Sequence, residues 1–360
     1  MRYLLNVLRR INSKYYKKSI LSIILMLTII TLSGCDLADL AGSKETKTVT
    51  GTEIHFDTVM SITLYGEDEK VLNKALEDSF HKVESLEEIF SAQLDSSELS
   101  IINRDIASGK AEFNISNELC DVIECAIRVG KSSNGALDIT IGNLINLWGI
   151  GTDHEKIPTD EEIETALENT GMEYIGLDVD KGVLSVKSSN VQLNVGAVAK
   201  GYAADVVKNL ILEENPSIYG ILDFGGNIIT IGSKTDGSKW KVGIKNPIDT
   251  NAVYGGVSID DLSVVTSGNY ERYFTVGNIR YHHILNPASG YPADNGIISA
   301  TIIGKSSMVC DAYSTACFCL GIDEAIKLVN SNDEIECILI DNEGNAHFSD
   351  NMSKYNFIKE

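Results

Sequence analysis

The chain has 360 residues and a formal charge of −21, with 43% apolar residues, 30 glycines and only five prolines. This length and composition fit a globular α+β protein of one large or two closely packed domains. Six basic residues and no acidic one stand in Met1–Ser19, so the rest carries 24 basic and 51 acidic side chains, a formal charge of −27. Such an acidic body repels nucleic acid and anionic lipid head groups, which argues against a nucleic-acid-binding protein.

The N-terminus has the pattern of a secretory signal. The apolar run Ile20–Leu32 follows the basic segment and ends in Leu32-Ser33-Gly34-Cys35. This order is typical of a cleaved signal peptide, and the apolar run is shorter than a membrane-spanning helix needs. Leu-Ser-Gly-Cys also matches the lipobox of bacterial lipoproteins, in which the cysteine is lipidated and becomes the new N-terminus.

We therefore predict a signal peptide over 1–34, a tether over 35–48 that begins at lipidated Cys35, and a folded domain over 49–360. The expected location is the extracytoplasmic face of the cell membrane, held by the lipid anchor. An uncleaved signal anchor is the alternative.

From residue 49 onwards, strand and helix patterns are mixed. Strands are predicted from apolar and β-branched runs at Thr52–Tyr65, Ile221–Ile231 (broken by Gly225-Gly226) and Trp240–Pro247. Helices are predicted from periodicity and capping residues over Glu67–Glu88, after a cap at Ser97 or Ser96, over Leu119–Ser132, from beyond Asp138 to about Trp148, and over Pro158–Asn169 with Thr159 as cap.

The segment Val191–Asp205 predicts a strand that ends at Val195-Gly196 and a helix that starts at once and runs to about Glu213. A strand-to-helix turn with glycine exposes backbone amides and the positive end of a helix, which suits a phosphate group. Lys200 lies in the first turn of this helix. Gly201 costs about 1 kcal/mol relative to Ala in a helix, which indicates close packing against a neighbouring element. Plain strand–helix packing explains the segment equally well.

The segment Val264–Gly321 holds the densest set of polar motifs. It opens with a predicted turn, Thr266-Ser267-Gly268, followed by strands Tyr270–Val276 and Ile279–Leu285 joined by a II′ turn at Gly277-Asn278. On the second strand the side-chain period of two places His282 and His283 on opposite faces. Strand Ile297–Ile303 and helix Met308–Leu320, with Ser306-Ser307 as cap and Gly321 as its end, complete the segment.

On that helix, Asp311 and Thr315 are four residues apart and share a face, which we expect to be exposed. Carboxylate and hydroxyl oxygens suit Mg²⁺ beside a phosphate. A capping Asp and a Thr bonded back to the helix are the structural alternative. Six cysteines remain after Cys35, in spacings that match no zinc site, and we expect most of them to be small buried side chains.

Nine motifs in order carry a family resemblance: DTVMSITLY, SSELSIIN, GALDITIGNLINLWG, LNVGAVAKGYAAD, ILDFGGNIITIG, WKVGIKNP, VVTSGNYERYF, YHHILNPASGYP and CDAYSTACFCLG. The chain resembles the ApbE family of FAD:protein FMN transferases from about Thr52 to Gly321. The resemblance implies an α+β, T-fold-like architecture of antiparallel sheets with flanking helices. It also implies Mg²⁺-dependent transfer of FMN from FAD to a Thr or Ser hydroxyl of a target protein, with release of AMP.

The resemblance assigns roles to residues of the domain over 49–360. Asp311 and Thr315 match the family's Mg²⁺ ligands, with the carbonyl of Ala197 and a contribution from Ser314. His283 matches the histidine proposed as base. The positions that match the lining of the FAD site are Met60, Ala136, Leu137, Asp138, Asn194, Lys200, Thr266 and Ile284. The implied partner is an acceptor protein, a membrane redox subunit in related systems, that carries a short Thr- or Ser-containing flavinylation motif.

The chain departs from the family pattern at Ser61, Asn194 and Asn286, which replace a glycine and two aspartates. Two other functions stay open. One is an FAD-binding or FAD-hydrolysing lipoprotein without a protein acceptor, in which water replaces the hydroxyl. The other is a non-enzymatic surface lipoprotein, against which the intact Asp311/Thr315 pair argues.

Overall fold

The computed structural model describes residues 45–168 and 170–360. The predicted signal peptide, Cys35 and most of the tether lie outside the described residues. Thr46–Glu360 forms one compact unit, and the following paragraphs describe that unit alone. Its first strand begins at Lys47, two residues before the predicted domain boundary, so the last residues assigned to the tether belong to the fold.

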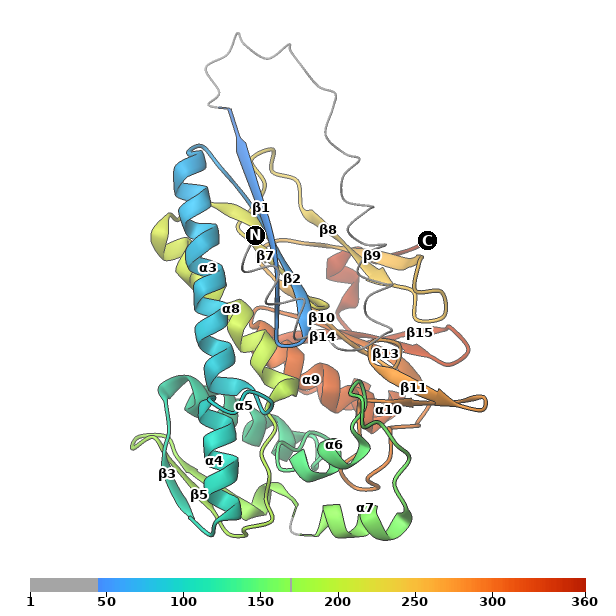
Figure 1. Ribbon diagram of the computed structural model, residues 1–360. Helices are drawn as coiled ribbons and strands as arrows, with labels where there is room; N and C mark the ends of the chain where they lie inside the picture. Colours follow the sequence, from blue (N-terminus) through green and yellow to red (C-terminus); the bar gives the residue numbers. More distant parts are fainter. Residues whose placement is uncertain (1–44, 169) are drawn as a thin grey trace. The chain divides into compact units, whose positions relative to one another are not determined.

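An eight-stranded sheet, antiparallel throughout, forms the centre of this unit (Figure 1). In spatial order its strands are β1 (Lys47–His55), β2 (Thr58–Gly66), β6 (Tyr219–Phe224), β7 (Asn227–Ile231), β10 (Ser263–Gly268), β13 (Ile297–Gly304), β14 (Ile335–Asp341) and β15 (Ala346–Phe348). Neighbouring residues on a strand point to opposite faces, so each strand contributes to two different cores.

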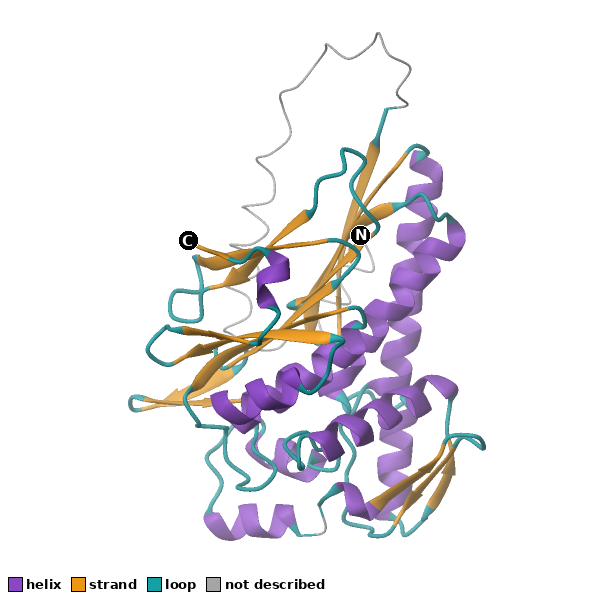
Figure 2. Cartoon of the chain, turned by 180° about the vertical axis from the view of Figure 1, so that it is seen from behind, coloured by secondary structure: helices purple, strands orange, loops and turns teal. Residues whose placement is uncertain are grey.

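Helices cover one face of this sheet, as Figure 2 shows from behind. They are α3 (Glu69–Phe90), α8 (Gly196–Glu214), α9 (Ser307–Leu320) and α10 (Ile322–Asn330). A second sheet covers the other face with the strands β8 (Trp240–Lys245), β9 (Val253–Ile259) and β16 (Ile358–Lys359). Val265 packs in the helix-side core and its neighbour Val264 in the sheet-side core, as the alternation requires.

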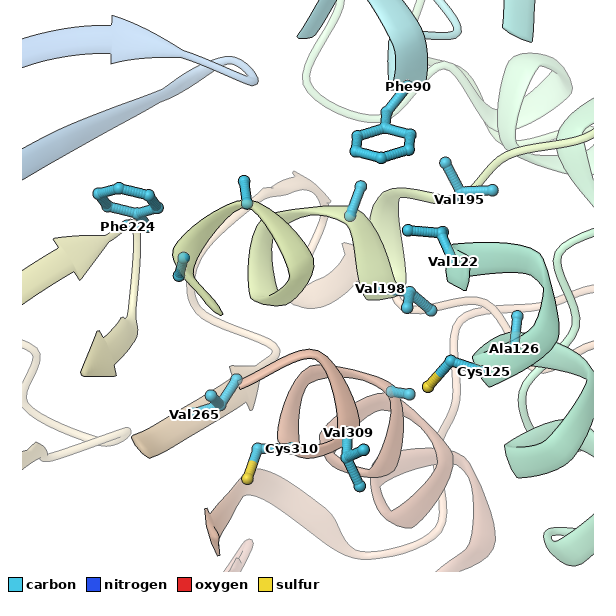
Figure 3. Packing of buried hydrophobic residues seen from close by; sticks show 14 of the residues in the cluster. Phe90, Val122, Cys125, Ala126, Val195, Val198, Phe224, Val265, Val309 and Cys310 are labelled. Carbon is cyan, nitrogen blue, oxygen red and sulfur yellow. The ribbon is translucent and has the colours of Figure 1, made fainter. Parts of the chain in front are cut away.

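The helix-side core is formed where α8, α9 and the helix α5 (Asn117–Ser132) meet (Figure 3). Val122 and Cys125 of α5 pack there with Val198 of α8 and Val309 of α9. Since α8 and α9 also carry the predicted phosphate and metal residues, this core fixes how those residues face one another.

Smaller elements complete the unit. They are α4 (Glu98–Ala107), α6 (Gly142–Trp148), α7 (Asp160–Leu167), the sheet β3 (Glu112–Asn114), β5 (Val183–Val186) and β4 (Ile175–Asp178), the hairpin β11 (Tyr273–Val276) and β12 (Ile279–His282), and 3₁₀ turns at Met172–Tyr174 and Met352–Tyr355. None of the helices in the described ranges combines the length and hydropathy that crossing a bilayer requires.

Most predicted elements are confirmed, several with their caps. Ser97 caps α4 and Ser306 caps α9. Thr159 forms a capping box with Glu162 at the start of α7. The turn between β11 and β12 has the positive φ that its type needs, +61° at Gly277. The six described cysteines are free and buried, as expected.

Four local predictions are wrong. The predicted strand Thr52–Tyr65 is two antiparallel strands, β1 and β2, joined by a turn at Phe56-Asp57. Val191–Val195 is not a strand, because only one bridge, between Gln192 and Ile141, forms there. Thr266-Ser267-Gly268 is not a turn but the end of β10, because its pairing with β13 overrides the turn preference of small residues. The strand that carries the histidines ends at His282, so His283 lies just beyond it.

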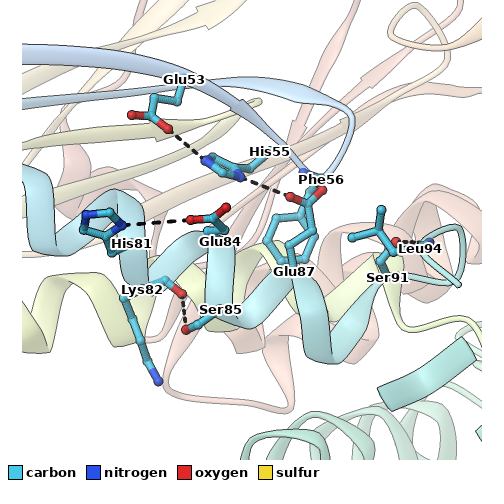
Figure 4. A network of polar contacts seen from close by, with 10 residues as sticks. All are labelled: Glu53, His55, Phe56, His81, Lys82, Glu84, Ser85, Glu87, Ser91 and Leu94. Atoms are coloured by element: carbon cyan, nitrogen blue, oxygen red, sulfur yellow. Dashed lines mark hydrogen bonds and ion pairs between the residues drawn. The ribbon is translucent and has the colours of Figure 1, made fainter. Parts of the chain in front are cut away.

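The turn between β1 and β2 is tied to α3 (Figure 4). His55 lies between two carboxylates, with Nδ1 3.0 Å from Glu87 and Nε2 3.1 Å from Glu53. Burial of the ring opposes its protonation, but the two carboxylates outweigh that effect and raise the pKa of His55. Glu87 also accepts a hydrogen bond of 2.7 Å from the amide of Phe56. These contacts hold the turn at Phe56-Asp57 in place.

Candidate active site

The helix α8 packs at Gly201 directly against the first turn of α9, without a side chain between them. A Cβ on Gly201 would collide with the backbone at Ser307, so only glycine permits this approach. The carboxylate of Asp205 accepts hydrogen bonds from the Ser306 hydroxyl and from the amides of Ser307 and Met308, at 2.7 to 3.0 Å. Asp205 therefore fixes the N-terminus of α9 against α8, which confirms the close packing predicted at Gly201.

Asp311 lies in this contact and is 3% exposed, so the prediction of an exposed helix face is wrong for this residue. Its Oδ2 accepts a hydrogen bond of 2.9 Å from the amide of Gly201 and lies 3.7 Å from Nζ of Lys200. Burial raises the pKa of Asp311, while Lys200 and the Gly201 amide oppose that rise. The side chain of Asn227 is a further group that acts against the rise in the pKa of this carboxyl.

The hydrogen bond to Asp311 also affects the carbonyl of Ala197. In a regular helix the amide of residue 201 donates to the carbonyl of residue 197. Here that amide also donates to Asp311, and a carbonyl oxygen has a second lone pair for another partner. The carboxylate of Asp311 and the carbonyl of Ala197 therefore both lie next to the Gly201 amide.

Hydroxyl groups continue the site along α9. Oγ of Ser267, at the end of β10, lies 2.7 Å from Oγ of Ser314 and 3.5 Å from Oγ1 of Thr315. Ser314 is fully buried and also donates to the carbonyl of Asp311, at 2.8 Å. Two protein groups thus already engage the Ser314 hydroxyl, whereas Thr315 is partly exposed on the same side of the helix. Thr315 has the more open oxygen of the two.

These groups fit a hard divalent cation. The candidate ligands are oxygens only, from a carboxylate, a hydroxyl and a carbonyl, which Mg²⁺ prefers over softer donors. A buried carboxylate is better stabilised beside a cation than without one. In the described ranges no three His, Cys, Asp or Glu side chains cluster to hold a metal ion.

A polar loop adjoins the start of α8. The amide of Asn194 donates to the carbonyl of Ile139 at 2.8 Å, and its side-chain Oδ1 accepts from the amide of Gly196 at 2.9 Å. Asp138 accepts from both the amide and the hydroxyl of Thr140 at 2.7 Å, and burial raises the pKa of its carboxyl. Lys200 donates to the carbonyl of Gly196 at 3.2 Å. The segment around Asp138 and the α8 N-terminus are therefore one continuous surface.

The two histidines differ as predicted. His282 is buried, and its Nε2 donates to the carbonyl of Ala293 at 3.1 Å. His283 is exposed, and its Nδ1 lies 3.2 Å from the carbonyl oxygen of Arg272. A carbonyl only accepts, so Nδ1 carries the proton and the neutral ring presents a free lone pair at Nε2.

The surroundings of His283 also change the pKa of its ring. Protein packed around the ring, and then the positive charges of Arg272 and Lys200, lower the pKa of His283 below its ordinary value of 6.5. The ring remains open to solvent, which limits the desolvation. His283 is therefore neutral at pH 7 and within electrostatic reach of Lys200.

The comparisons with known proteins agree with this arrangement. The family model of the ApbE family matches residues 56–339. The chain belongs to the ApbE family. It is 31% identical over 280 residues to an FAD:protein FMN transferase of Klebsiella pneumoniae, covering 78% of this chain and 84% of the relative. It is 29% identical to an FAD:protein FMN transferase of Treponema pallidum, covering 85% of this chain and 88% of the relative.

Solved ApbE structures have the same fold. The ApbE protein of Thermotoga maritima superposes with a TM-score of 0.78 and 28% identity, covering 86% of this chain and 99% of that protein. The flavin transferase ApbE of Vibrio cholerae superposes with a TM-score of 0.76 and 26% identity, covering 86% and 100%. The predicted α+β class of antiparallel sheets with flanking helices is confirmed.

The ApbE fold brings several of the predicted residues of this chain together. Lys200 contacts Asp311, and Thr315 contacts the strand end that holds Thr266, whose hydroxyl lies 2.9 Å from that of Thr301. The side chains of Met60, Leu137 and Ile284 are buried in the helix-side core, so they support the site from beneath rather than face it. Their roles toward FAD stay predictions.

Three residues of the site were not found from the sequence. They are Ser267, which bonds to Ser314 and Thr315, Arg272, which bonds to His283, and Asn227, which is 1% exposed at the start of β7. The sequence could have indicated Asn227 as a candidate site residue, because it is a polar residue at the start of an apolar strand, directly after Gly225-Gly226. Ser267 and Arg272 lie in the motif VVTSGNYERYF, but their partners are distant in the chain, so the motif did not indicate these bonds.

Proposed function

We propose that this chain transfers the FMN moiety of FAD to a Thr or Ser hydroxyl of a target protein and releases AMP. The acceptor oxygen attacks the phosphorus of the flavin-side phosphate, and the bond from that phosphorus to the oxygen of the AMP phosphate breaks. The acceptor proton passes to a base, and AMP leaves with the bridging oxygen. The support is membership of the ApbE family together with relatives named FAD:protein FMN transferase.

The observation that carries the proposal is the fixed orientation of His283, whose pKa is also lowered by the charge of Lys200, the lysine that pairs with Asp311. Its fixed tautomer leaves Nε2 without a proton, and its lowered pKa keeps the ring neutral at pH 7. A neutral imidazole at a solvent-open edge of the site can accept the proton of an incoming hydroxyl. General-base catalysis of this kind contributes about 10²- to 10⁴-fold to the rate.

Asp311, Thr315 and the carbonyl of Ala197 would hold one Mg²⁺. When bound, Mg²⁺ would neutralise the charge of the diphosphate and stabilise the charge that develops on the leaving AMP. Lys200 and the positive end of α8 lie at the same place and orient an anionic group. This local positive charge matters because the body of the protein is strongly acidic and would otherwise repel a diphosphate.

The test uses FAD, Mg²⁺ and a membrane redox subunit that carries a Thr-containing flavinylation motif. Covalent flavin on the acceptor, seen as in-gel fluorescence, with one AMP released per flavin attached, supports the transferase. Release of free FMN and AMP without a fluorescent acceptor supports the alternative, an FAD pyrophosphatase. Both products should disappear when Mg²⁺ is chelated, and persistence of either without a divalent cation contradicts the metal assignment.

We further propose that the protein is a lipoprotein on the extracytoplasmic face of the membrane, anchored through Cys35. The acidic body has no electrostatic hold on anionic lipid, so the anchor alone would retain it. Cys35→Ser should then release the protein from the membrane fraction or leave an uncleaved precursor. Retention in the membrane with normal processing before residue 35 contradicts this proposal.

A further inference from the structure

The hairpin of β11 and β12 extends from the body of the folded unit and leads back to the proposed base (Figure 1). β11 starts directly after Arg272, and β12 ends directly before His283. One face of the hairpin is held in place, because the ring of Tyr281 stacks on Trp148 of α6 at 5.7 Å between ring centres and on Phe274 at 5.3 Å. The hairpin is therefore a fixed element whose root is part of the candidate active site.

The edge of β11 that faces away from β12 is unpaired. The amide of His283 donates to the carbonyl of Arg272 at 3.1 Å, and bonded and non-bonded pairs alternate along an antiparallel ladder. In this register Tyr273 and Thr275 take the non-bonded positions, so their amides and carbonyls point away from β12. Within the described ranges, no other group forms a hydrogen bond with them.

The composition of β11 does not block this edge. Exposed strand edges attract further strands, and soluble proteins usually protect them with lysine, proline or a bulge. β11 reads Tyr-Phe-Thr-Val in an unbroken register and has none of these features. Tyr273 is 43% exposed, Val276 50% and Ile279, across the turn, 60%. An open edge with exposed apolar side chains is the kind of surface to which an extended peptide adds as a strand.

The charge of the hairpin limits which peptide fits. Residues 272–283 hold two arginines and no acidic residue, in a strongly acidic protein. Arg272 and Arg280 both donate to neutral oxygens, and neither pairs with a carboxylate of the described residues. The partner that fits this edge is therefore an extended segment with apolar side chains and a neutral or acidic charge.

The proposed base stands at the root of the same edge. Nδ1 of His283 lies 3.2 Å from the carbonyl oxygen of Arg272, the residue that leads into β11. A strand added to β11 passes Arg272 at the spacing of neighbouring strands, about 5 Å. The side chains of such a strand come within reach of the imidazole, so the edge leads directly to the site at which an acceptor hydroxyl is needed.

We propose that the free edge of β11 binds the acceptor protein through an extended segment, which adds to the hairpin as a third strand and brings its Thr or Ser hydroxyl to His283. The assignment rests on the proposed function and adds the surface that recognises the acceptor. Backbone hydrogen bonds to Tyr273 and Thr275 fix the register of the added strand, and the register decides which residue of the acceptor faces the base.

The experiment removes an edge donor without breaking the hairpin. In the full chain, Thr275→Pro deletes an outward-facing amide, and edge strands tolerate proline at such positions. Glu112→Pro is the matched control on β3, the edge strand of another sheet. The Val186 amide donates to the carbonyl of Ala111 at 2.8 Å, so the next amide along β3, that of Glu112, also points outward.

Flavinylation is measured against the concentration of the Thr-containing membrane redox subunit, beside FAD titration by flavin fluorescence and the melting temperature. For Thr275→Pro we expect the KM for the subunit to rise about tenfold, with FAD affinity within about twofold of the wild type and an unchanged melting temperature. For Glu112→Pro we expect wild-type values of all three. A KM in Thr275→Pro equal to that of the wild type overturns the assignment.

A second variant tests the edge without a change of the backbone. Val276→Thr keeps the shape of the side chain and replaces an exposed methyl by a hydroxyl, so the KM for the subunit should rise about threefold. Val179→Thr is its control, because that valine is 47% exposed and follows β4, in the same sheet as β3. If Thr275→Pro lowers the melting temperature, this pair decides, and equal KM values for the two valine variants overturn the assignment.

Direct binding of the subunit separates this assignment from the proposed function. If the wild type binds the subunit, Thr275→Pro weakens the binding about tenfold and no labelling occurs, the transferase proposal fails and the docking edge stands. Labelling by both proteins with equal KM keeps the transferase and removes the docking edge. A dimer of the wild type in sedimentation that Thr275→Pro abolishes would assign the edge to a second copy of this chain and would also overturn the proposal.

Discussion

His283 and Arg272 are joined by two hydrogen bonds to one carbonyl oxygen. The oxygen of Arg272 accepts from the amide of His283 at 3.1 Å and from its ring Nδ1 at 3.2 Å. The guanidinium of the same arginine donates to the carbonyls of Phe56 at 3.3 Å and Asp57 at 3.2 Å. The proposed base is therefore tied through Arg272 to the β1–β2 turn, a segment more than 200 residues away in the sequence.

That turn is itself constrained. Phe56 and Asp57 have φ values of +50° and +55°, a region that bulky residues rarely adopt. Glu87 holds the amide of Phe56 from one side, and Arg272 holds its carbonyl from the other. Unfavourable backbone conformations persist where the surroundings hold them, and here those surroundings support the proposed base.

The first prediction concerns His283 as the base. His283→Ala should bind FAD within a few-fold of the wild type, since Lys200, Asp311 and the α8 N-terminus remain, and should fail to flavinylate an acceptor. In-gel flavin fluorescence of the acceptor, beside FAD titration of the enzyme, measures both. His81→Ala is the control, because that histidine is exposed on α3 and remote from the site. Labelling at the wild-type rate would make His283 a structural residue.

The second prediction concerns Arg272. In Arg272→Met the pKa of His283 should rise toward 6.5, since a positive charge that lowers it is removed. The acidic limb of the pH–rate profile should then move to higher pH, with a lower kcat and little change in FAD affinity. NMR of the His283 ring gives the same pKa without activity.

Arg280→Met is the control for Arg272, since that guanidinium lies 4.3 Å from the Tyr273 ring centre, on the hairpin. Identical pH profiles for Arg272→Met and the wild type would show that Arg272 does not tune the base.

The third prediction concerns the metal. Asp311→Asn keeps the shape of the side chain and an acceptor for the Gly201 amide, so the free energy of unfolding should change by about 1 kcal/mol or less. Transfer should be lost, and Mg²⁺ should no longer strengthen FAD binding, because the charged ligand is gone. Titration of FAD with and without Mg²⁺ measures this effect. Full transfer by Asp311→Asn in Mg²⁺ would remove α9 as the metal site.

The fourth prediction concerns stability and His282. Burial lowers the pKa of His282 to about 4, and its neutral ring is bonded on both sides, since Nε2 donates to Ala293 and Nδ1 accepts from the amide of Ile284 at 3.3 Å. The unfolded chain, with a histidine pKa near 6.5, binds this proton first as the pH falls. Stability is therefore retained above pH 6.5 and lost progressively toward pH 4, by about 2 kcal/mol at pH 5.

Urea denaturation at pH 7 and pH 5 checks this value. His282→Gln should be less stable at pH 7 but should show a pH-dependent loss smaller by about the same 2 kcal/mol. An equal loss of stability in the variant and the wild type would assign the pH dependence to other groups.

Local sequence determined the helices and several of their ends. Ser97, Thr159 and Ser306 cap helices because a side-chain oxygen bonds amides two or three residues away, an interaction that needs no tertiary partner. The same locality placed Asp311 and Thr315 on one helix face and Gly277 in a hairpin turn. The ordered motifs also identified the family, since nine short patterns in sequence are specific even where each alone is weak.

Only the tertiary structure decided which polar groups meet. The burial of Asp311, its bond to Gly201 and the orientation of His283 by Arg272 all join segments that are far apart in the chain, and no local pattern encodes such pairs. The same reason accounts for the errors at Val191–Val195 and Thr266-Ser267-Gly268, where strand pairing depends on which partner edge is available. The periodicity of apolar residues predicts which face of a segment is buried. Which element packs against that face is decided by the arrangement of the whole sheet and its helices.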